Sequence, residues 1–440
     1  MAEIINMMKY EYYKESGVNW LEKIPASWEV KRIKSLSQVK RGSSPRPIDA
    51  PKYFSDNGEY SWVRIADVTA NEHYLNYTKE KLSKLGSSLS VKLRPKDIFL
   101  SIAGSVGKPM IANINCCIHD GFVYFPNLKC NIEFIYRVFE AGQLFNGLGK
   151  YGTQLNLNTD TVGGVSIALP PTEEQTAIVN FLDEKTTQID QAIAIKVQQV
   201  ELLKERKQII IQQAVTLGLN SHVAMKKSTV EWIDQIPEHW EIRRSKFLFT
   251  QRKEKAWKDD VQLSATQAYG VIPQEEYEAR TGKTVVKIQL HLDKRKHVEK
   301  DDFVISMRSF QGGLERAWSR GCIRSSYIIL KPLEDIDPAF YGYLLKLPSY
   351  IKALQRTASF IRDGQDLNFE NFSKVDLFIP PLEEQQAIAK YIKQLMTSSE
   401  DGIELLKQQI EKLKEYKTTL INSAVTGKIK VPDINQPVLA

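Results

Sequence analysis

Two long stretches of the chain place apolar residues at the spacing of a coiled-coil helix. Between Glu173 and Leu217 there is no proline or glycine. Positions 193, 196, 200, 203, 207, 210 and 214 step alternately by three and four, which is a heptad seam. The seam recurs 210 residues later, with Ile403, Ile410, Leu413, Leu420 and Ala424 in place of Ile193, Val200, Leu203, Ile210 and Ala214. The pattern predicts two long helices, at 171–219 and 381–428.

Two matched seams in one chain most simply pack against each other. If the halves of the chain are related by a pseudo-two-fold axis, the two helices run antiparallel and act as a spacer. A helix of about 40 residues is roughly 60 Å long, comparable to about 18 base pairs of B-DNA. Lys207 and Lys417 interrupt the two seams at the matching step. Such a lysine either fixes the register of the helix pair or extends from the seam edge into solvent.

Both predicted helices begin after a pair of prolines. Leu169 to Gln175 reads Leu-Pro-Pro-Thr-Glu-Glu-Gln, and Ile379 to Gln385 reads Ile-Pro-Pro-Leu-Glu-Glu-Gln. Thr172 with Gln175 three residues later has the spacing of a capping box. In the second copy Leu382 replaces the threonine, so that start is expected to rest on Glu383 and Glu384 interacting with the helix dipole.

The remaining sequence has the short apolar runs and polar turns of mixed strand and helix. Residues 1–170 and 220–380 are therefore expected to form two similar domains, and 429–440 a tail. The fold class is α+β, with two mixed α/β domains separated by two long antiparallel coiled-coil helices in a pseudo-two-fold arrangement. The strand candidates are Ile98 to Ala103, Gly121 to Phe125, Val165 to Leu169, Phe303 to Met307, Ser326 to Leu330 and Val375 to Ile379.

The two domains share a frame but not their loops. At an offset of 212, Trp20, Ile24, Pro25, Trp28 and Glu29 correspond to Trp232, Ile236, Pro237, Trp240 and Glu241. At an offset of 205, Ser101, Gly107, Ala112, Cys117 and Ile118 correspond to Ser306, Gly312, Ala317, Cys322 and Ile323. Residues 42–90 and 254–297 differ heavily. One scaffold with two different surfaces indicates two related recognition domains with different preferences. A molecule with two similar ends suits a ligand that also has two similar ends, and duplex DNA is such a ligand.

Composition places the chain among ordinary folded proteins. Of its 440 residues, 42% are apolar and 26% charged, and the net charge of +7 permits nucleic acid without demanding it. The densest basic stretch, 243–258, interleaves cations with aromatic residues and is either a phosphate-binding surface or a solvated face. The four cysteines lack zinc spacing, so we expect reduced core residues. No apolar run suggests a signal peptide or membrane span, so a cytoplasmic protein with no membrane partner is expected.

Motifs that would carry catalysis fail on inspection. Gly147 to Gly152 matches a dinucleotide-binding pattern but follows a helical stretch, and Gly282-Lys283-Thr284 lacks the upstream glycine of a phosphate loop, because residue 277 is tyrosine. The Pro-Pro pairs lack the flanking residues of an amino methyltransferase, and the histidines show no metal spacing. The sequence thus predicts no catalytic residues, no metal and no cofactor bound by this chain.

The polar loops suit DNA better. Cations and small polar residues offer contacts to phosphates, and arginine and glutamine can pair bidentately with guanine and adenine. The loops 40–46 and 104–108 are also expected to offer backbone amides to phosphates. The DNA-binding candidates are Lys40, Arg41, Ser43, Arg46, Arg64, Ser105, Lys108, Gln154 and Asn156 in the first domain, and Arg252, Lys253, Lys255, Gln267, Arg308, Ser309, Gln311, Arg362 and Gln365 in the second.

The doubled frame resembles the specificity subunit of type I restriction and modification systems. The resemblance is carried by the Ile-Pro-x-x-Trp segments (Ile24 to Trp28, Ile236 to Trp240), the Pro-Pro-x-Glu-Glu-Gln helix starts and the Ala-Val-Thr helix ends (Ala214 to Thr216, Ala424 to Thr426). Each motif is weak alone, but their order, repeated twice, is specific. The similarity covers the chain from about Trp20 to Lys428.

The resemblance implies a subunit without an active site, whose two target recognition domains each read half of an asymmetric bipartite DNA site. The helices would set the spacing and dock two modification subunits, which would bind S-adenosylmethionine and methylate adenine, while separate motor subunits would translocate and cleave. Two other readings remain open from the residues: a coiled-coil scaffold that binds only proteins, and a self-contained DNA-modifying enzyme with an unrecognised site.

Overall fold

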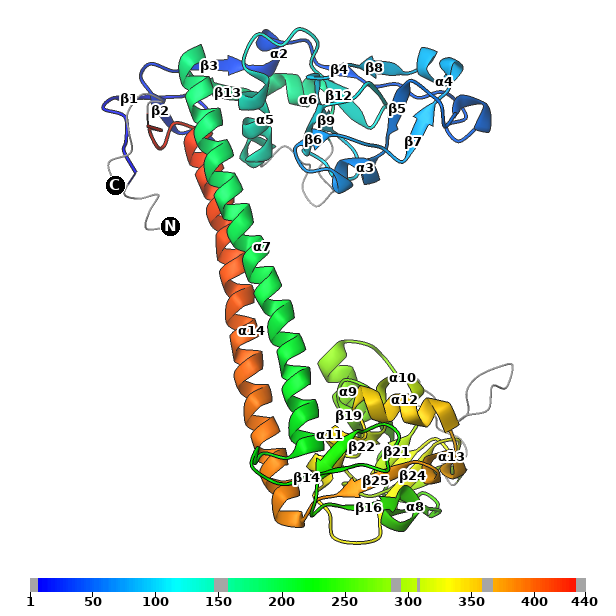
Figure 1. Cartoon of the computed structure of the whole chain (residues 1–440). Coiled ribbons are helices and arrows are strands. Elements are labelled where there is room, and N and C mark those ends of the chain that lie inside the picture. The colour runs from blue at the N-terminus through cyan, green and yellow to red at the C-terminus, as the bar shows by residue number, and fades with distance from the viewer. Residues whose placement is uncertain (1–6, 146–156, 286–293, 307–308, 358–366, 433–440) are drawn as a thin grey trace. The chain divides into compact units, whose positions relative to one another are not determined.

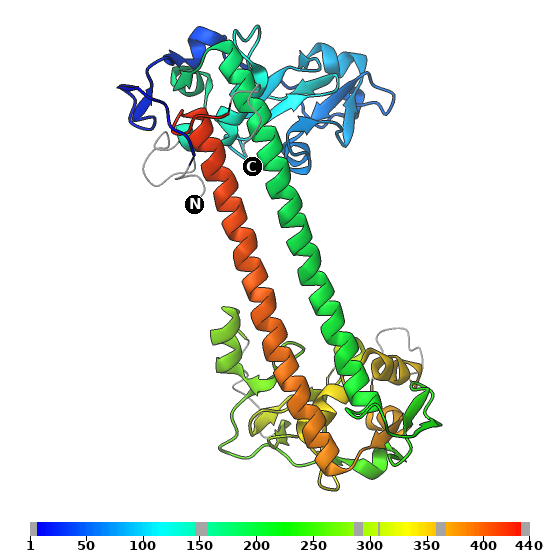
Figure 2. The ribbon, with the colours of Figure 1, turned by 60° about the vertical axis from the view of Figure 1, so that its left-hand side comes forward.

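The computed structural model describes residues 7–145, 157–285, 294–306, 309–357 and 367–432, and divides into two compact units. One unit comprises Met1–Val197 with Lys407–Ala440, and the other comprises Gln198–Leu406. Each unit holds one mixed α/β domain and a part of both long helices (Figures 1 and 2). Each long helix therefore contributes residues to both units.

The first domain contains two sheets of mixed direction. The five-stranded sheet has the order β4-β12-β9-β10-β6, and the four-stranded sheet the order β7-β5-β11-β8. The strands are β4 (Lys40–Arg41), β5 (Tyr60–Val63), β6 (Tyr74–Leu75), β7 (Glu80–Leu82), β8 (Val91–Leu93), β9 (Ile98–Ser101), β10 (Pro109–Ala112), β11 (Cys116–Ile118) and β12 (Phe122–Tyr124). The helices are α2 (Ile33–Leu36), α3 (Ile65–Ala70), α4 (Lys84–Ser88), α5 (Ile132–Glu140) and α6 (Thr159–Gly164), with short 3-10 turns η1 (Pro51–Tyr53) and η2 (Gln143–Phe145).

The second domain repeats this plan with smaller sheets. Its main sheet has the order β17-β24-β21-β22, and the pairs β18-β19 and β20-β23 lie beside it. The strands are β17 (Phe249–Arg252), β18 (Leu263–Thr266), β19 (Gly270–Pro273), β20 (Lys296–Val298), β21 (Phe303–Ile305), β22 (Glu315–Arg316), β23 (Gly321–Ile323) and β24 (Ile328–Pro332). The helices are α8 (Ser245–Leu248), α9 (Gln274–Thr281), α10 (Ser309–Gly312), α11 (Pro338–Leu344), α12 (Pro348–Thr357) and α13 (Phe369–Ser373).

Each unit also has a frame of two separate two-stranded sheets. In the first unit β3 (Glu29–Arg32) pairs with β13 (Ser166–Leu169), and β1 (Tyr13–Glu15) with β2 (Lys23–Pro25). In the second, β16 (Glu241–Arg244) pairs with β25 (Asp376–Ile379), and β14 (Met225–Lys227) with β15 (Gln235–Pro237). Each predicted strand thus overlaps an observed strand, although Met307 lies outside the described residues, and the internal repeat is a repeat of structure.

The two long helices are α7 (Thr172–Leu217) and α14 (Leu382–Val425), and within each unit they run antiparallel and side by side (Figures 1 and 2). In the first unit Lys196 Nζ of α7 donates to Gln409 Oε1 of α14 at 2.6 Å. Seam residues such as Val200, Ala214, Ile410 and Leu420 are buried, as a heptad seam requires. The predicted antiparallel coiled coil is confirmed.

The seam lysines each meet an acidic residue of the other helix. Lys417 Nζ lies 2.7 Å from Asp190 Oδ2 in the first unit, and Lys207 Nζ lies 3.9 Å from Glu400 Oε1 in the second. Asp190 and Glu400 are themselves 210 residues apart. Because both partners repeat at the seam offset, these pairs support the register interpretation over a lysine that only reaches solvent.

The predicted capping box at the start of α7 is wrong. The Gln175 backbone N–H donates to Pro171 O at 2.9 Å, and its side chain is buried in the domain instead of returning to Thr172. Gln175 Nε2 donates to Pro170 O at 2.8 Å, and its Oε1 accepts from the backbone N–H of Asn131 at 2.9 Å. Gln385 repeats both bonds with Pro380 O and the N–H of Asp337, each at 2.8 Å.

One glutamate of each repeated motif, Glu174 or Glu384, accepts a hydrogen bond from a buried tryptophan of the domain as well as lying at the helix start. Trp28 Nε1 donates to Glu174 Oε2, and Trp240 Nε1 to Glu384 Oε2, both at 3.0 Å. These two indole rings are fully buried. Glu384, expected to interact with the helix dipole, also accepts a hydrogen bond from a tryptophan 144 residues away in sequence. The repeated motif therefore ties each long helix to its domain.

Candidate nucleic-acid interface

In the first domain several candidate loops meet at one edge of the sheets. The Gly42 N–H donates to Phe122 O and the Ile102 N–H to Gly121 O, both at 2.9 Å. These bonds join the loop after β4, the turn before β12 and the loop after β9. A side chain added at Gly104 would lie 3.0 Å from Ile65, so the start of α3 adjoins the same loops. The structure thereby brings together the segments carrying Arg41, Ser43, Arg46, Arg64 and Ser105.

One aspartate holds two of these arginines. Arg41 Nε donates to the backbone oxygen of Asp120 at 2.5 Å, and Arg46 Nη2 to its Oδ2 at 3.0 Å. The Ser43 hydroxyl donates to Leu89 O at 3.0 Å. Both arginines remain exposed, as does Lys40 on β4. Positive side chains held in place at a loop edge can contact phosphates with little further loss of freedom.

Two other cations form hydrogen bonds within the domain. Arg64 Nε donates to Glu80 Oε2 at 2.5 Å and Arg64 Nη2 to Asp49 Oδ1 at 3.2 Å, and the hydrogen bond to Glu80 is the main reason that the pKa of Arg64 is raised. Lys108 Nζ donates to Val68 O at 2.6 Å and to Asn71 O at 3.1 Å, at the end of α3. Burial lowers the pKa of Lys108. Lys108 therefore completes the carbonyl end of a helix.

The expectation that these loops offer free backbone amides is wrong for several positions. Gly42 and Ser43 donate their N–H groups to Phe122 O and Ile118 O. Val106, Gly107 and Lys108 donate theirs to Gly104 O, Ser101 O and Ser105 O. Because the loops fold back on their own strands, these amides satisfy carbonyls inside the domain. Contacts to DNA at these positions would have to come from side chains.

The second domain divides its candidates in the same way. Arg252 binds the buried Asp302 through Nε at 2.6 Å and Nη2 at 3.1 Å, and its Nη1 donates to Glu254 at 3.0 Å. Burial alone would lower the pKa of Arg252, but these bonds raise it. Lys253 and Lys255 follow directly and are exposed. In this cluster the two lysines are therefore exposed to solvent, whereas Arg252 forms an ion pair inside the domain.

Three further candidates surround the turn after β18. Ser309 is fully buried, and its hydroxyl accepts from the Ser306 N–H at 2.9 Å, which is a fold contact. Gln311 is exposed on α10. Gln267 is exposed in the turn, and its amide nitrogen would lie only 2.7 Å from a side-chain carbon placed on Gly312. Gln154, Asn156, Arg308, Arg362 and Gln365 lie outside the described residues.

Aromatic residues beside arginines were not among the candidates. The Arg316 guanidinium lies 4.5 Å from the Trp318 ring centre, and that indole is exposed. Trp257 stacks on the buried His297 with ring centres 3.8 Å apart, and Arg320 lies 5.4 Å from the Trp257 ring centre. The sequence could have indicated the pair of Arg316 and Trp318, because the two residues are only two positions apart. It could not have indicated the stack of Trp257 on His297, because those residues are 40 positions apart.

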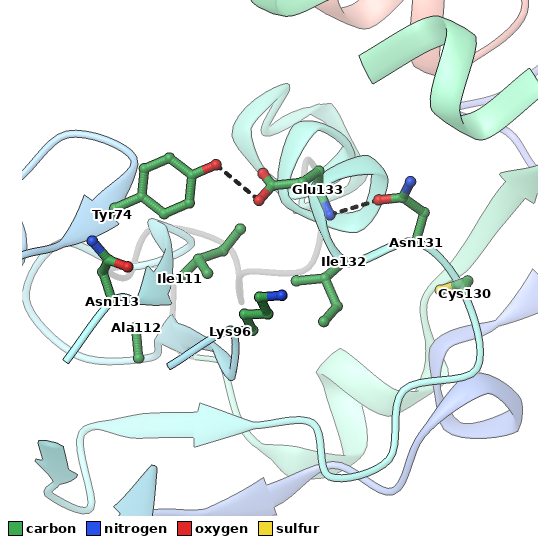
Figure 3. A pocket seen from close by; sticks show the side chains of 9 residues that line it. All are labelled: Tyr74, Lys96, Ile111, Ala112, Asn113, Cys130, Asn131, Ile132 and Glu133. Carbon is green, nitrogen blue, oxygen red and sulfur yellow. Dashed lines mark hydrogen bonds between the residues drawn. The ribbon is translucent and has the colours of Figure 1, made fainter. Parts of the chain in front are cut away.

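A cavity of about 660 Å³ opens at the other end of the first domain's main sheet (Figure 3). Tyr74 Oη donates to Glu133 Oε1 at 2.9 Å across its rim, and burial followed by this bond raises the pKa of Tyr74 to about 12. Its lining residues are Tyr74, Lys96, Ile111, Ala112, Asn113, Cys130, Asn131, Ile132 and Glu133. None of the sequence candidates lines it, so the cavity is separate from the loop edge.

Within the described ranges, no three His, Cys, Asp or Glu side chains are grouped as a metal site would require. Over the same ranges, no helix combines the length and apolar character needed to cross a bilayer. Cys116, Cys117 and Cys322 are buried and Cys130 is partly buried; all four are free thiols. The expectation that the cysteines are core residues is therefore confirmed for Cys116, Cys117 and Cys322.

The chain is similar in sequence and in fold to known specificity subunits of type I restriction systems. A Methanocaldococcus jannaschii protein described as a type I restriction enzyme MjaX specificity subunit is 26% identical over 98% of this chain and 100% of its own length. The MjaVIII specificity subunit of the same organism is 24% identical, covering 97% of this chain and 99% of that one.

Two solved structures share the fold. A chain from a structure of the type I R-M system superimposes with a TM-score of 0.64 at 15% identity, covering 91% of this chain and 98% of the other. The HsdS subunit from Thermoanaerobacter tengcongensis gives a TM-score of 0.52 at 15% identity, covering 92% and 98%. Residues 25–201 and 237–415 each match the type I restriction modification DNA specificity domain, so the chain belongs to that family and is a type I specificity subunit with two such domains.

Proposed function

We propose that this chain is the non-catalytic, DNA-reading subunit of a cytoplasmic type I restriction-modification complex. Each domain reads one half of an asymmetric bipartite site in duplex DNA. The two long helices set the distance between the half-sites and dock two modification subunits. Those subunits, and not this chain, bind S-adenosylmethionine and methylate adenine; a restriction motor subunit joins where the system has one.

The observation that carries this proposal is that the two copies keep their frame and change their loops. The frame contacts are the same in both copies: Trp20 Nε1 donates to Ser166 O and Trp232 Nε1 to Asp376 O, each at 3.1 Å. The candidate loops, by contrast, carry exposed Arg41 and Arg46 in the first copy and exposed Lys253, Lys255 and Gln267 in the second. A common frame with unlike polar edges supports two readers of unlike sequences.

The test is to map methylated adenines in cells that express the modification subunit with or without this chain. We expect one bipartite motif that appears only when both are present. Methylation without this chain, or by this chain alone, would contradict the proposal.

A scaffold that binds only proteins is the second candidate, favoured by the length of α7 and α14. The two differ in their response to salt. A DNA reader that neutralises Z phosphates loses log affinity against log salt with a slope of about −0.9Z, whereas a scaffold gives no DNA binding to titrate. Binding of the complex to duplexes with and without the mapped motif, across a salt series, separates them.

A further inference from the structure

The turn between β18 and β19 is held from several sides. The Thr266 hydroxyl accepts from the Tyr269 N–H at 3.0 Å and donates to Gly270 O at 3.1 Å, which closes the turn on itself. Gly270 has a φ of +72°, and a side chain there would lie 2.7 Å from both Arg316 O and Trp318 Nε1. The turn therefore has a single backbone path, fixed before any ligand binds.

Gln267 projects from this fixed turn. Its amide end lies against Gly312, and a side-chain carbon at Gly312 would come within 2.7 Å of Gln267 Nε2 and displace the Gln267 side chain from this position. Gly313 is equally constrained, with a φ of +78° and a side-chain position only 2.3 Å from Leu345 O. Because Gly312 and Gly313 have no side chains, the Gln267 side chain can pack directly against their backbone while it stays exposed.

Lys346 links the turn to a buried acid. Its Nζ donates to Gln267 O at 3.1 Å and lies 2.6 Å from Glu315 Oε2. Glu315 is only 2% exposed, and burial raises its pKa while the ammonium opposes that change. A carboxylate withdrawn from water destabilises the fold unless its partner is in place, so the ion pair fixes where Lys346 sits.

The fold itself does not demand this ion pair. At the offset of 205 that aligns Ala112 with Ala317, the first domain has Met110 in place of Glu315. Met110 is buried in β10, the counterpart of β22, so an apolar residue fills this position well. Replacing a buried ion pair with apolar residues is often neutral or stabilising, which points to a role for Glu315 and Lys346 other than stability.

We propose that the turn Thr266–Gly270 is a specificity-determining element of the second domain, in which Gln267 reads an adenine and Lys346 is its positioning residue. A glutamine amide pairs bidentately with the N6 and N7 edge of adenine in the major groove. Arg280, 5.2 Å from the Tyr269 ring centre, and Lys346 supply positive charge beside the turn. This inference rests on the proposed function, because it assigns one base pair of one half-site.

The test uses the full chain with its modification subunit and a DNA library randomised over the motif. Gln267→Ala should relax discrimination at one A·T pair of one half-site by roughly 5- to 150-fold, leaving every other position unchanged. Lys346→Met should relax the same position more weakly, and Lys346→Arg should restore it. Two exposed residues of the same unit, Lys352 on α12 and Gln235 on β15, provide matched controls as Lys352→Met and Gln235→Ala.

The inference is overturned if Gln267→Ala keeps the wild-type motif, or if the changed positions spread over both half-sites. Thermal melting of each variant separates loss of reading from loss of folding, and the exposed Gln267 truncation decides the matter if Lys346→Met proves unstable. If the wild-type complex yields no bipartite motif at all, the proposed function fails and not merely this assignment.

Discussion

At the residue scale, the partner of a cation decides its role more than its type does. Arg252 and Lys253 are adjacent basic residues at the end of one strand. Arg252 is turned inward to the buried Asp302, while Lys253 is exposed. The same separation distinguishes Lys108, bound to helix carbonyls, from the exposed Lys40. Removing these residues should therefore give two different phenotypes.

We expect Arg252→Met to destabilise the second unit by about 3 kcal/mol, because it leaves a buried carboxylate without its partner. Lys253→Met should change stability by less than about 0.5 kcal/mol and weaken DNA binding instead. Urea unfolding measures the first effect and binding to duplex DNA the second. Since burial already raises the pKa of Asp302, the loss in Arg252→Met should shrink at acid pH as Asp302 becomes protonated. Equal losses of stability in both variants would refute this division.

His297 gives the second domain a stability that depends on pH. Its Nδ1 lies 2.8 Å from Asp260 Oδ2 and its Nε2 2.9 Å from Glu299 Oε1, with Trp257 stacked on the ring. Burial alone would lower the pKa of His297, but the two carboxylates raise it above its ordinary value. Of the neighbouring charges, Arg320 lies over Trp257, 3.8 Å from Asp260 Oδ1.

The folded domain therefore binds the histidine proton more tightly than the unfolded chain. The resulting stability is complete below the unfolded pKa of about 6.5 and is lost as the pH rises through the higher folded value. We expect the difference in melting temperature between wild type and His297→Gln to be largest near pH 6 and to fall toward pH 9. A difference that grows with pH would contradict the assignment of a protonated His297.

At the element scale, the helix starts show how a local motif can serve a tertiary purpose. The Thr-x-x-Gln spacing suits a capping box, but the buried Gln175 joins Pro170 to Asn131 across the domain. The repeat was informative here, because Leu382 replaces the threonine while Gln385 is kept. A glutamine that persists without its capping partner has another function.

Gln175→Ala should destabilise the first unit by about 1–3 kcal/mol, because it strands a buried N–H and a buried carbonyl. Thr172→Ala should be close to neutral, whereas loss of a true capping residue typically costs about 1 kcal/mol. Chemical denaturation of the two variants compares them directly. The interpretation is wrong if Thr172→Ala is the more damaging change.

At the scale of the whole molecule, duplication supplies both the two readers and the two helices that join them. Matched seams allow residues to be removed from both helices without breaking their register. A heptad removed from each shortens the helix pair by about 10 Å, or roughly three base pairs of B-DNA.

We expect such a double deletion to shorten the spacing between half-sites while each half-site keeps its sequence. Methylome sequencing of the variant complex reads out both properties. A deletion from one helix alone, which puts the two seams out of step, serves as the control and should abolish assembly. Altered bases within a half-site would argue against a spacer role for the helices.

The sequence by itself determined the repeat, the heptad seams and the apolar strands, because these follow from periodicities that survive in one dimension. It also led to the family, through motifs that recur in order. Only the tertiary structure decided that Gln175 and Glu174 bind backbone and side-chain groups of the domain. It also decided that Arg252 and Lys108 form hydrogen bonds inside the fold, and that Gln267 packs against Gly312. Those outcomes depend on contacts between residues far apart in the chain, and the burial that such contacts create sets what each polar group can do.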